Sequence, residues 1–491
     1  MKWILKTAFI FLLCFSAHTS YGATKYVCNS GAGTMDGSTQ ANCYNNWFPN
    51  NAISAGDTLY VCGAISTTST LFIQDAGTAS SYITIRGDCS DPGSLNGNGV
   101  ADPVLQLGTA GNAASFVELL NLTVTNSHPS TGECITDSSL GAGGGFNKFT
   151  SLNVNTCGTY GLLLQKPSPT VSNSEISYCN DDCVGGTTGA TYVTIRGNTF
   201  HHFSMGGTTG DAIFLNNGTP TSTVYIERNT IYWDNDNSTK QGMIVGMATG
   251  TLNVGYNNLI SRTGTIVNHG ITITAATVAN VYGNYCYGMK ACITHFADSN
   301  EGVDDTLNIY GNIANGSQYI AQINPSIGSP TINIYNNTGY GLAGRGIEVT
   351  AGGAVDVSNN SVSVVSSTTA LYISASVGSF TGNNNNYYNE GLTTNFIQNF
   401  ECGSTYQSIS AYKLGCASVE QRSLSVRPQF RIDTPRSRNE FRLYPSSPLI
   451  GAGIKMPGKM MFDNGGRSYN YVPAIGAWEY GSRDFANYMQ F

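Results

Sequence analysis

The chain has 491 residues and a formal net charge of −7, and only 11% of its residues are charged. Its body is acidic and most of its arginines lie after residue 421, which argues against nucleic acid as a partner, because phosphate binding needs a basic face. Hydrophobic residues reach 41%, which excludes a disordered chain, and abundant Gly, Asn, Ser and Thr favour an all-β protein with many turns.

Residues 1–22 have the pattern of a secretory signal peptide. Lys2 and Lys6 precede an apolar run over 8–15, and the small residues needed for cleavage follow at 20–23. No later stretch is long and apolar enough to cross a bilayer as a helix. We therefore expect a secreted protein, extracellular or periplasmic, that is not inserted into a membrane and is a monomer.

The cysteines form close pairs along the chain. Cleavage of the signal peptide removes Cys14 and leaves twelve of the thirteen cysteines, and their spacings match neither a zinc ribbon nor a zinc finger. An exported chain with an even number of locally paired cysteines indicates disulfides. As a working hypothesis we pair them sequentially: Cys28/Cys43, Cys62/Cys89, Cys134/Cys157, Cys179/Cys183, Cys286/Cys292 and Cys402/Cys416.

A repeated phrase, apolar-x-x-Asn, runs through the middle of the chain at steps of 23 to 31 residues. Each Asn follows a short alternating strand, and Asn tolerates the left-handed conformation that a tight corner needs. One such coil cannot bury its apolar face alone, so neighbouring coils must stack, and stacked Asn side chains can then bond along the axis. The repeated positions are Asn198, Asn229, Asn257, Asn284, Asn312, Asn337, Asn360 and Asn383.

This pattern resembles the right-handed parallel β-helix superfamily of secreted proteins, which includes pectate lyases and polygalacturonases. The segments 55–61 and 82–87 look like the opening coils of such proteins, and those at 447–453, 463–467 and 475–480 look like a tail common in bacterial members. The resemblance implies an all-β, single-stranded right-handed parallel β-helix, and it implies an architecture without specifying a reaction. We divide the chain into signal peptide (1–22), N-terminal cap (23–55), parallel β-helix (56–400) and irregular C-terminal capping tail (401–491).

A row of polar residues is predicted along one edge of the solenoid. In each coil a second strand opens with a small-apolar step, and the residue before that step defines the row. Adjacent parallel strands lie about 4.7–4.9 Å apart, so Asp182 and Asp211 should be neighbours. Their mutual repulsion should raise the pKa of one carboxyl and leave the other ionised, which provides a proton donor and a proton acceptor. The row reads Glu133, Tyr160, Asp182, Asp211, Gln241, His269, Ala291, Tyr319 and Arg345.

Two short motifs add to this row. The run 180–183 resembles the Asp-Asp-Cys element of polygalacturonases, which implies that Asp181 and Asp182 act on a glycosidic bond. The run 268–270 resembles that family's Gly-His-Gly element, with Asn in the first place, and this implies a catalytic role for His269. The upstream Asn-Thr-Asp and the Arg-Ile-Lys elements are absent, so the resemblance does not extend to polygalacturonase activity itself.

Our first hypothesis is hydrolysis of a polysaccharide or oligosaccharide by Asp182 and Asp211, assisted by Asp181. Sugars would be positioned by Tyr160, Gln241, Lys240, Trp233, Glu133 and Arg345, and no metal site is assigned.

Two alternatives remain open. A calcium-assisted lyase would use Lys240, with Lys290 and Arg345 as further bases, and would hold Ca²⁺ as its cofactor on Asp234 and Asp236. A non-catalytic solenoid would bind glycan in the same groove. For single residues, turn capping by Asp211 or Glu133, and covering of the solenoid by Tyr160, Trp233 or His201-His202, are the competing interpretations.

Overall fold

The computed structural model describes residues 22–31, 33–49, 52–109, 112, 114–138, 144–187, 189–206, 210–217, 222–234, 240–247, 250–262, 264, 266–296, 306–325, 328–365, 368–389, 396–400, 402–455 and 473–478. The predicted signal peptide falls outside these residues except for its last position, and it stays a prediction.

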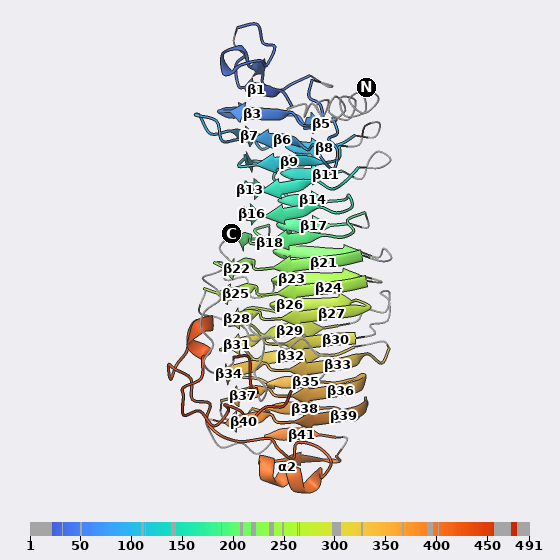
Figure 1. Cartoon of the computed structure of the whole chain (residues 1–491), viewed down its shortest axis with the longest axis vertical. Helices are drawn as coiled ribbons and strands as arrows, with labels where there is room; N and C mark the ends of the chain where they lie inside the picture. Colours follow the sequence, from blue (N-terminus) through green and yellow to red (C-terminus); the bar gives the residue numbers. More distant parts are fainter. Residues whose placement is uncertain are drawn as a thin grey trace, which may run out of the picture.

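The described chain forms a tall column of stacked coils, and each coil contributes one strand to each of three sheets (Figure 1). Every pairing between successive coils is parallel, and the single antiparallel pair joins the last two strands of the third sheet. The predicted all-β, right-handed parallel β-helix is therefore confirmed. Among the described residues, no helix has the length and apolar character needed to cross a membrane.

The first sheet holds fifteen strands. In spatial order they are β2 (Tyr44–Asn45), β1 (Thr24–Cys28), β3 (Thr58–Cys62), β6 (Ile83–Arg86), β9 (Val117–Leu120), β12 (Lys148–Thr150), β15 (Thr170–Ser172), β18 (Thr194–Arg196), β21 (Ser222–Glu227), β24 (Gly250–Gly255), β27 (Val278–Tyr282), β30 (Thr306–Tyr310), β33 (Thr331–Tyr335), β36 (Gly352–Ser358) and β39 (Val377–Asn383).

The second sheet holds thirteen strands. They are β4 (Ala64–Ser66), β7 (Ser94–Asn96), β10 (Thr123–Thr125), β13 (Asn153–Cys157), β16 (Glu175–Cys179), β19 (Thr199–His201), β22 (Thr230–Trp233), β25 (Asn258–Ser261), β28 (Tyr285–Tyr287), β31 (Ile313–Asn315), β34 (Thr338–Leu342), β37 (Ser361–Val364) and β40 (Asn386–Asn389).

The third sheet holds fourteen strands. They are β5 (Leu71–Ile73), β8 (Leu105–Leu107), β11 (Ile135–Asp137), β14 (Leu162–Leu164), β17 (Val184–Gly186), β20 (Ile213–Asn217), β23 (Met243–Met247), β26 (Ile271–Ala275), β29 (Ala291–His295), β32 (Tyr319–Ile323), β35 (Ile347–Val349), β38 (Leu371–Ile373), β41 (Ile397–Asn399) and β42 (Ser404–Tyr406).

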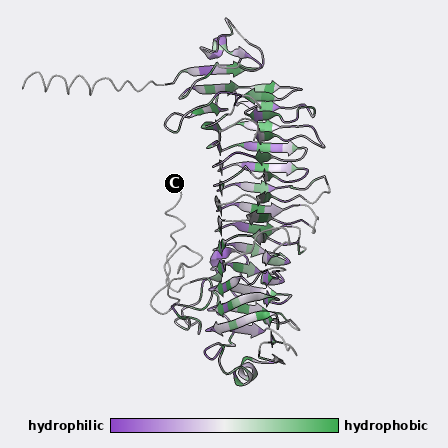
Figure 2. Ribbon diagram, turned by 90° about the vertical axis from the view of Figure 1, so that its right-hand side faces the viewer, coloured by the Kyte–Doolittle hydropathy of each residue, from purple (hydrophilic) through white to green (hydrophobic). Residues whose placement is uncertain are grey.

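Apolar side chains fill the interior of the column. Alternation along each strand sends every second residue inward, so aliphatic residues of successive coils stack into continuous columns, as Ile195 and Ile226 do. Figure 2 shows this hydrophobic core as a line of green segments along the solenoid. Because each coil buries its apolar face only against its neighbours, the whole stack forms one core.

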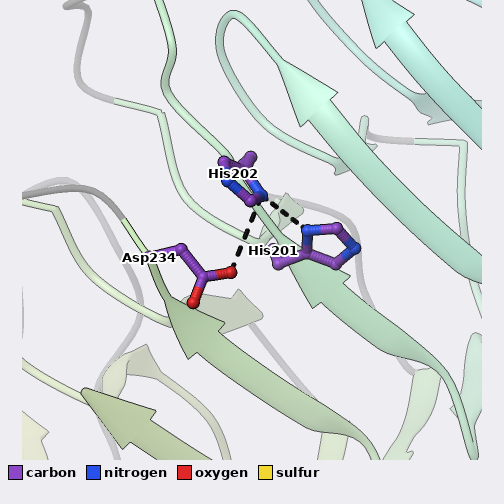
Figure 3. Close-up of side chains that lie close together, drawn as sticks. All are labelled: His201, His202 and Asp234. Carbon is purple, nitrogen blue, oxygen red and sulfur yellow. Dashed lines mark hydrogen bonds and ion pairs between the residues drawn. The ribbon is translucent and has the colours of Figure 1, made fainter. Parts of the chain in front are cut away.

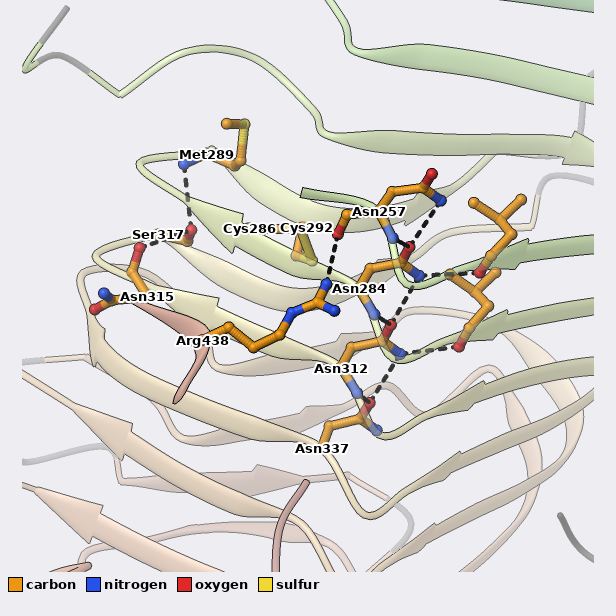
Figure 4. The surroundings of a disulfide bond; sticks show 12 residues. Asn257, Asn284, Cys286, Met289, Cys292, Asn312, Asn315, Ser317, Asn337 and Arg438 are labelled. Atoms are coloured by element: carbon orange, nitrogen blue, oxygen red, sulfur yellow. Dashed lines mark hydrogen bonds between the residues drawn. A yellow bond between two sulfur atoms is a disulfide. The ribbon is translucent and has the colours of Figure 1, made fainter. Parts of the chain in front are cut away.

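A buried ladder of Asn side chains runs along the corner between the first and second sheets (Figure 4). At each step a side-chain oxygen accepts from the backbone N–H and the side-chain amide of the preceding ladder residue, as Asn312 does from Asn284 at 2.9 Å each. The predicted axial stacking is therefore confirmed. The ladder runs through Asn198, Asn229, Asn257, Asn284, Asn312, Asn337, Asn360 and Asn385 and ends on the buried carboxyl of Glu420.

The structure corrects two details of the repeat. The last ladder residue is Asn385 and not Asn383, because Gly382 occupies the core position that aliphatic residues fill in earlier coils. The left-handed residue is also not the ladder Asn but the residue before it, because the ladder side chain has to point along the axis. These left-handed residues are Gly197, Arg228, Tyr256, Gly283, Gly311, Asn336, Asn359 and Asn384.

Both ends of the column are covered. At the N-terminal end, β1 pairs in parallel with β3 and extends the first sheet into the predicted cap, which also holds the 3-10 helix η1 (Gln40–Asn42). At the C-terminal end, helix α2 (Ile409–Gly415) buries Ile409 and Tyr412 against the last coil.

The tail then runs back along the second sheet. Its 3-10 helix η2 (Arg438–Phe441) lies against β28, and Tyr285 donates to the carbonyl of Arg436 at 2.7 Å. Arg438 is half-buried, and its guanidinium donates to the carbonyl of Asn257 at 3.0 Å (Figure 4). The tail thus covers the side of the solenoid as well as its end.

All six sequentially paired disulfides form, which confirms the predicted connectivity. Three of them close the corner between the second and third sheets, the corner from which the polar row projects. One of these, Cys179–Cys183, brackets Asp181 and Asp182 on a loop of only three residues. The disulfide therefore limits the movement of these two carboxylates.

Candidate functional site

The pairing register of the third sheet aligns the predicted row. Its inward-facing residues pair from coil to coil, and each row residue lies two positions before one of them. Ala291 and Tyr319 pair directly, which extends the same alignment toward the C-terminal end. The paired inward residues are Ile135, Leu162, Val184, Ile213, Met243, Ile271, Ile293, Ala321 and Ile347.

Asp182 and Asp211 occupy successive coils of this row and are both buried, at 5% and 2% exposure. Oδ1 of Asp182 accepts from the backbone N–H of Asp211 at 2.6 Å, and Oδ1 of Asp211 accepts from the N–H of Gln241 at 3.0 Å. The side chains are therefore bonded along the solenoid axis, as the Asn side chains are at the other corner.

Burial raises the pKa of both carboxyls into the neutral range. The pKa of Asp182 rises to about 7, mainly through desolvation, with repulsion from Asp181 adding to it. The pKa of Asp211 rises to about 8, through desolvation and then repulsion from Asp182. Near neutral pH the two groups therefore hold both a bound proton and a negative charge, which are the two states needed for general acid and general base catalysis.

A third carboxyl in the row behaves in the same way. Burial raises the pKa of Glu133 to about 7, and Asp102 adds repulsion and a side-chain hydrogen bond. Tyr160 lies in the row between Glu133 and Asp182, and its ring covers Gly185, where any Cβ would come within 2.6 Å of the ring. The pKa of Tyr160 is raised by burial and then by the neighbouring carboxylates, so its hydroxyl stays protonated and can donate.

Asp102 is a residue that sequence reasoning missed. It lies in the coil before that of Glu133, three positions before the paired residue Leu105, as Asp181 lies three positions before Val184. Its carboxyl accepts from the hydroxyl of Thr131 at 2.8 Å. The signal that could have found it is its position just before the coil of Glu133, at the same kind of corner as Asp181.

Gln241 and His269 continue the row after Asp211. The side-chain oxygen of Gln241 accepts from the hydroxyl of Thr272 on the next coil, which fixes the amide in place. Burial, with the charge of Lys290 adding, lowers the pKa of His269 to about 4, so its ring is neutral at physiological pH. The predicted positioning or catalytic role of His269 therefore involves a neutral imidazole. Lys240 is buried beside Gln241, and its charge acts on Asp211.

A second polar group lies farther along the same face, around Arg345. Its guanidinium donates to Glu348 at 2.7 Å and lies 3.9 Å from the ring centroid of Tyr372. Tyr319, in the row one coil before Arg345, also interacts with Glu348. Arg345 is five coils beyond Asp211 in the row, about 24 Å at the usual strand spacing, so it is remote from the carboxyl pair.

The prediction that Trp233 binds sugar is wrong, because this residue is inaccessible to a ligand. Its side chain is fully buried, at 0% exposure, and packs edge-on against Phe203 in the core. It sits at the inward-facing end of β22, so the strand alternation points it away from solvent. The competing interpretation, that Trp233 covers the outside of the solenoid, does not match this position either, because the side chain fills the core.

The predicted calcium ligands do not join the row. Asp234 lies beside His202 and Arg262, with its carboxylate 3.7 Å from Nδ1 of the first and 3.6 Å from the guanidinium of the second. A cation and an imidazole are poor neighbours for Ca²⁺, which prefers oxygen ligands. Asp236 lies outside the described residues.

The raised pKa values predict how stability depends on pH. A carboxyl whose folded pKa exceeds its unfolded value stabilises the fold below the unfolded pKa, near 4, and loses that contribution as pH rises through about 7 and 8. Wild type should therefore lose stability, relative to the Asp182→Asn/Asp211→Asn variant, between pH 4 and 9. Urea unfolding midpoints of both proteins across this range measure the difference.

The difference in stability between the two proteins at each pH isolates Asp182 and Asp211, because the other buried titratable groups are common to both. At pH 9 the variant should be more stable than wild type, since it has no charge to desolvate at these positions. Parallel pH profiles for the two proteins would contradict raised pKa values at Asp182 and Asp211.

Comparisons with known proteins give distant structural neighbours only. No protein-family model and no curated protein matches this chain. Pectate lyase Pel9A aligns at a TM-score of 0.42 and 15% identity, over 94% of this chain and 97% of that one. A PL6 family polysaccharide lyase from Pseudopedobacter saltans aligns at 0.39 and 12%, over 87% and 96%. An E. coli bacteriophage tailspike protein, in complex with a pentasaccharide, aligns at 0.39 and 13%, over 78% and 71%.

Proposed function

We propose that this chain is a secreted β-helix enzyme that hydrolyses a polysaccharide, with Asp182 and Asp211 sharing the acid and base roles. The observation that carries the proposal is the pair of buried carboxyls on successive coils, both with a pKa raised into the neutral range. Hydrolysis of a glycosidic bond needs one carboxyl that donates a proton and one that is ionised.

The two ladders of the molecule strengthen this proposal. At the corner between the first and second sheets, axial hydrogen bonds are made by the neutral amides of Asn side chains. At the corner of the row the same kind of bond is made by Asp182 and Asp211. A neutral amide could accept these backbone N–H bonds without the desolvation of a charge. Carboxyls at these positions therefore favour a chemical role over a purely structural one.

The remaining row residues fit the binding of sugars. Tyr160 presents a ring on the outer face one coil from Asp182, and the amide of Gln241 lies one coil from Asp211. In this proposal Asp181 assists the pair, while Glu133, Lys240 and His269 border it. Secretion is part of the proposal and is supported by the six disulfides, because such bonds persist in oxidising compartments.

The test is an assay of the purified mature protein on a panel of neutral and uronate-containing polysaccharides, with and without calcium. Reducing ends and ultraviolet absorbance are followed together. A hydrolase is expected to release reducing ends without an ultraviolet signal, whereas a lyase forms an unsaturated product that absorbs. If the protein turns over no glycan but binds one of them on an array, the proposal of an enzyme is wrong and the protein is a glycan-binding solenoid.

A further inference from the structure

A cluster of two imidazoles and a carboxylate lies on the second sheet, outside the polar row (Figure 3). His201 ends β19 and His202 follows it directly. Asp234 follows β22, one coil further along, and the register that pairs His201 with Tyr232 places it beside the two rings. One ligand atom from each residue lies within 4.8 Å of the other two. The proposed hydrolase uses none of these three side chains.

The distances within the cluster are those of groups that face a common point. Nδ1 of His201 lies 2.6 Å from Nδ1 of His202, and the latter lies 3.7 Å from Oδ2 of Asp234. In Figure 3 both rings and the carboxylate point toward one another. At a tetrahedral angle, bonds of about 2.0–2.1 Å from one ion to both nitrogens place the nitrogens about 3.3 Å apart, so the two rings would separate by about 0.7 Å to admit the ion.

A second carboxylate sets the proton on His201. Nε2 of His201 lies 3.0 Å from Oε1 of Glu175, on the preceding coil. Because a carboxylate is an acceptor, the ring proton belongs on Nε2, and the lone pair of Nδ1 faces His202. A histidine that donates its other N–H to a carboxylate is the usual arrangement in metal sites, where the partner orients the ring and raises its basicity.

Both rings are held by aromatic neighbours. The ring of His201 stacks on Tyr232 with centroids 5.0 Å apart, and the ring of His202 stacks on Tyr178 at 4.3 Å. His202 also has a left-handed backbone, with φ +51°, which turns its side chain toward Asp234. Ligands held in this way lose little conformational freedom when an ion binds.

Arg262 is the competing partner of the carboxylate. Its guanidinium lies 3.6 Å from Oδ1 of Asp234 and 3.6 Å from the ring centroid of Tyr232. It therefore approaches the oxygen other than the one that faces His202.

We propose that His201, His202 and Asp234 bind a divalent transition metal ion, with zinc as the best match. Two imidazoles and one carboxylate suit zinc and its neighbours and do not suit calcium or magnesium. Three protein ligands leave a fourth position for water. Glu175 is a positioning residue for His201. This site is independent of the proposed hydrolysis, because its ligands and the carboxyl pair are different residues.

The test uses the mature protein without a polyhistidine tag, stripped with a chelator and titrated with zinc sulfate alone. Isothermal titration and competition with a chromogenic chelator should give one zinc per chain for wild type. His202→Asn, which keeps a residue that tolerates the left-handed backbone, and Asp234→Asn should each weaken zinc binding by about 100-fold or more. Glu175→Gln should weaken it by roughly 10- to 100-fold, the range seen when such partners are removed.

His128→Asn is the matched control, because this histidine lies outside the cluster and contacts Ser130 and Thr131. It should bind zinc as wild type does. Loading with Co²⁺ should give visible absorption bands in wild type and in the control but not in His202→Asn. Absence of stoichiometric zinc in wild type, or equal affinity in the His202 and Asp234 variants, would overturn the proposal. Neither the zinc affinity nor the cobalt spectrum depends on activity on glycans, so this test is independent of the proposed hydrolysis.

Discussion

Replacing Asp182 and Asp211 together by Asn is expected to slow turnover of the polysaccharide by about 10³-fold or more. A positioned general acid or base contributes roughly 10²- to 10⁴-fold, and the variant has neither. Asn has the shape of Asp, and its side-chain oxygen can still accept the axial hydrogen bonds from the backbone N–H groups of residues 211 and 241. The coil geometry is therefore retained. The loss should therefore appear in kcat, with the fold intact.

The single variants sharpen this experiment. If the two carboxyls act as one acid–base pair, each single substitution should cost about as much as the double one, because either group is ineffective without the other. Asp356→Asn is the control, since this carboxyl lies on the first sheet and accepts a hydrogen bond from the hydroxyl of the nearby Ser358. Wild-type kcat in both single variants would assign Asp182 and Asp211 to the structural ladder alone.

Replacing Asn284 by Ala is expected to lower the free energy of unfolding by about 2–5 kcal/mol. This fully buried side chain accepts from the backbone N–H and the amide of Asn257 and donates to the carbonyl of Val254 and to Asn312. Its removal leaves buried polar groups without partners, at about 1–3 kcal/mol for each. Urea unfolding followed by circular dichroism measures the change.

Asn280→Ala is a matched control for the ladder experiment. Asn280 also belongs to a stack of amides, between Asn253 and Asn308, but that stack is half-exposed on the outer face of the first sheet. Water can replace the lost partners there, so we expect a change below about 1 kcal/mol. Equal destabilisation by the two substitutions would contradict the importance that we assign to burial of the ladder.

The repeat predicted the architecture because a solenoid is nearly one-dimensional. Each coil contacts only its neighbours, so the spacing of the repeated Asn residues reports the coil length directly. The same property aligned the polar row: a small-apolar step recurs before most strands of the third sheet between Glu133 and Arg345, and the register of that sheet aligns the residues that precede it. The sequential disulfides were also predictable, since neighbouring coils bring local cysteines together.

Details within a coil were less predictable, because they depend on which way a side chain turns at a corner. The ladder residue is Asn385 and not Asn383 because Gly382 stands at the core position that an apolar residue fills in earlier coils, so the apolar-x-x-Asn phrase misses it. Trp233 and Asp234 are adjacent in sequence, yet the first fills the core and the second reaches the surface. Composition alone does not distinguish them.

The stacking of the coils, the all-β class and the order of residues along the polar row were predictable, because they follow from local periodicity in the amino-acid sequence. Packing between coils sets the protonation of that row, because the raised pKa values of Asp182 and Asp211 come from burial by several coils at once. It also brings His201 and His202, from one coil, beside Asp234, from the next coil. Burial and proximity across coils are properties of the packed stack, and no single repeat contains them.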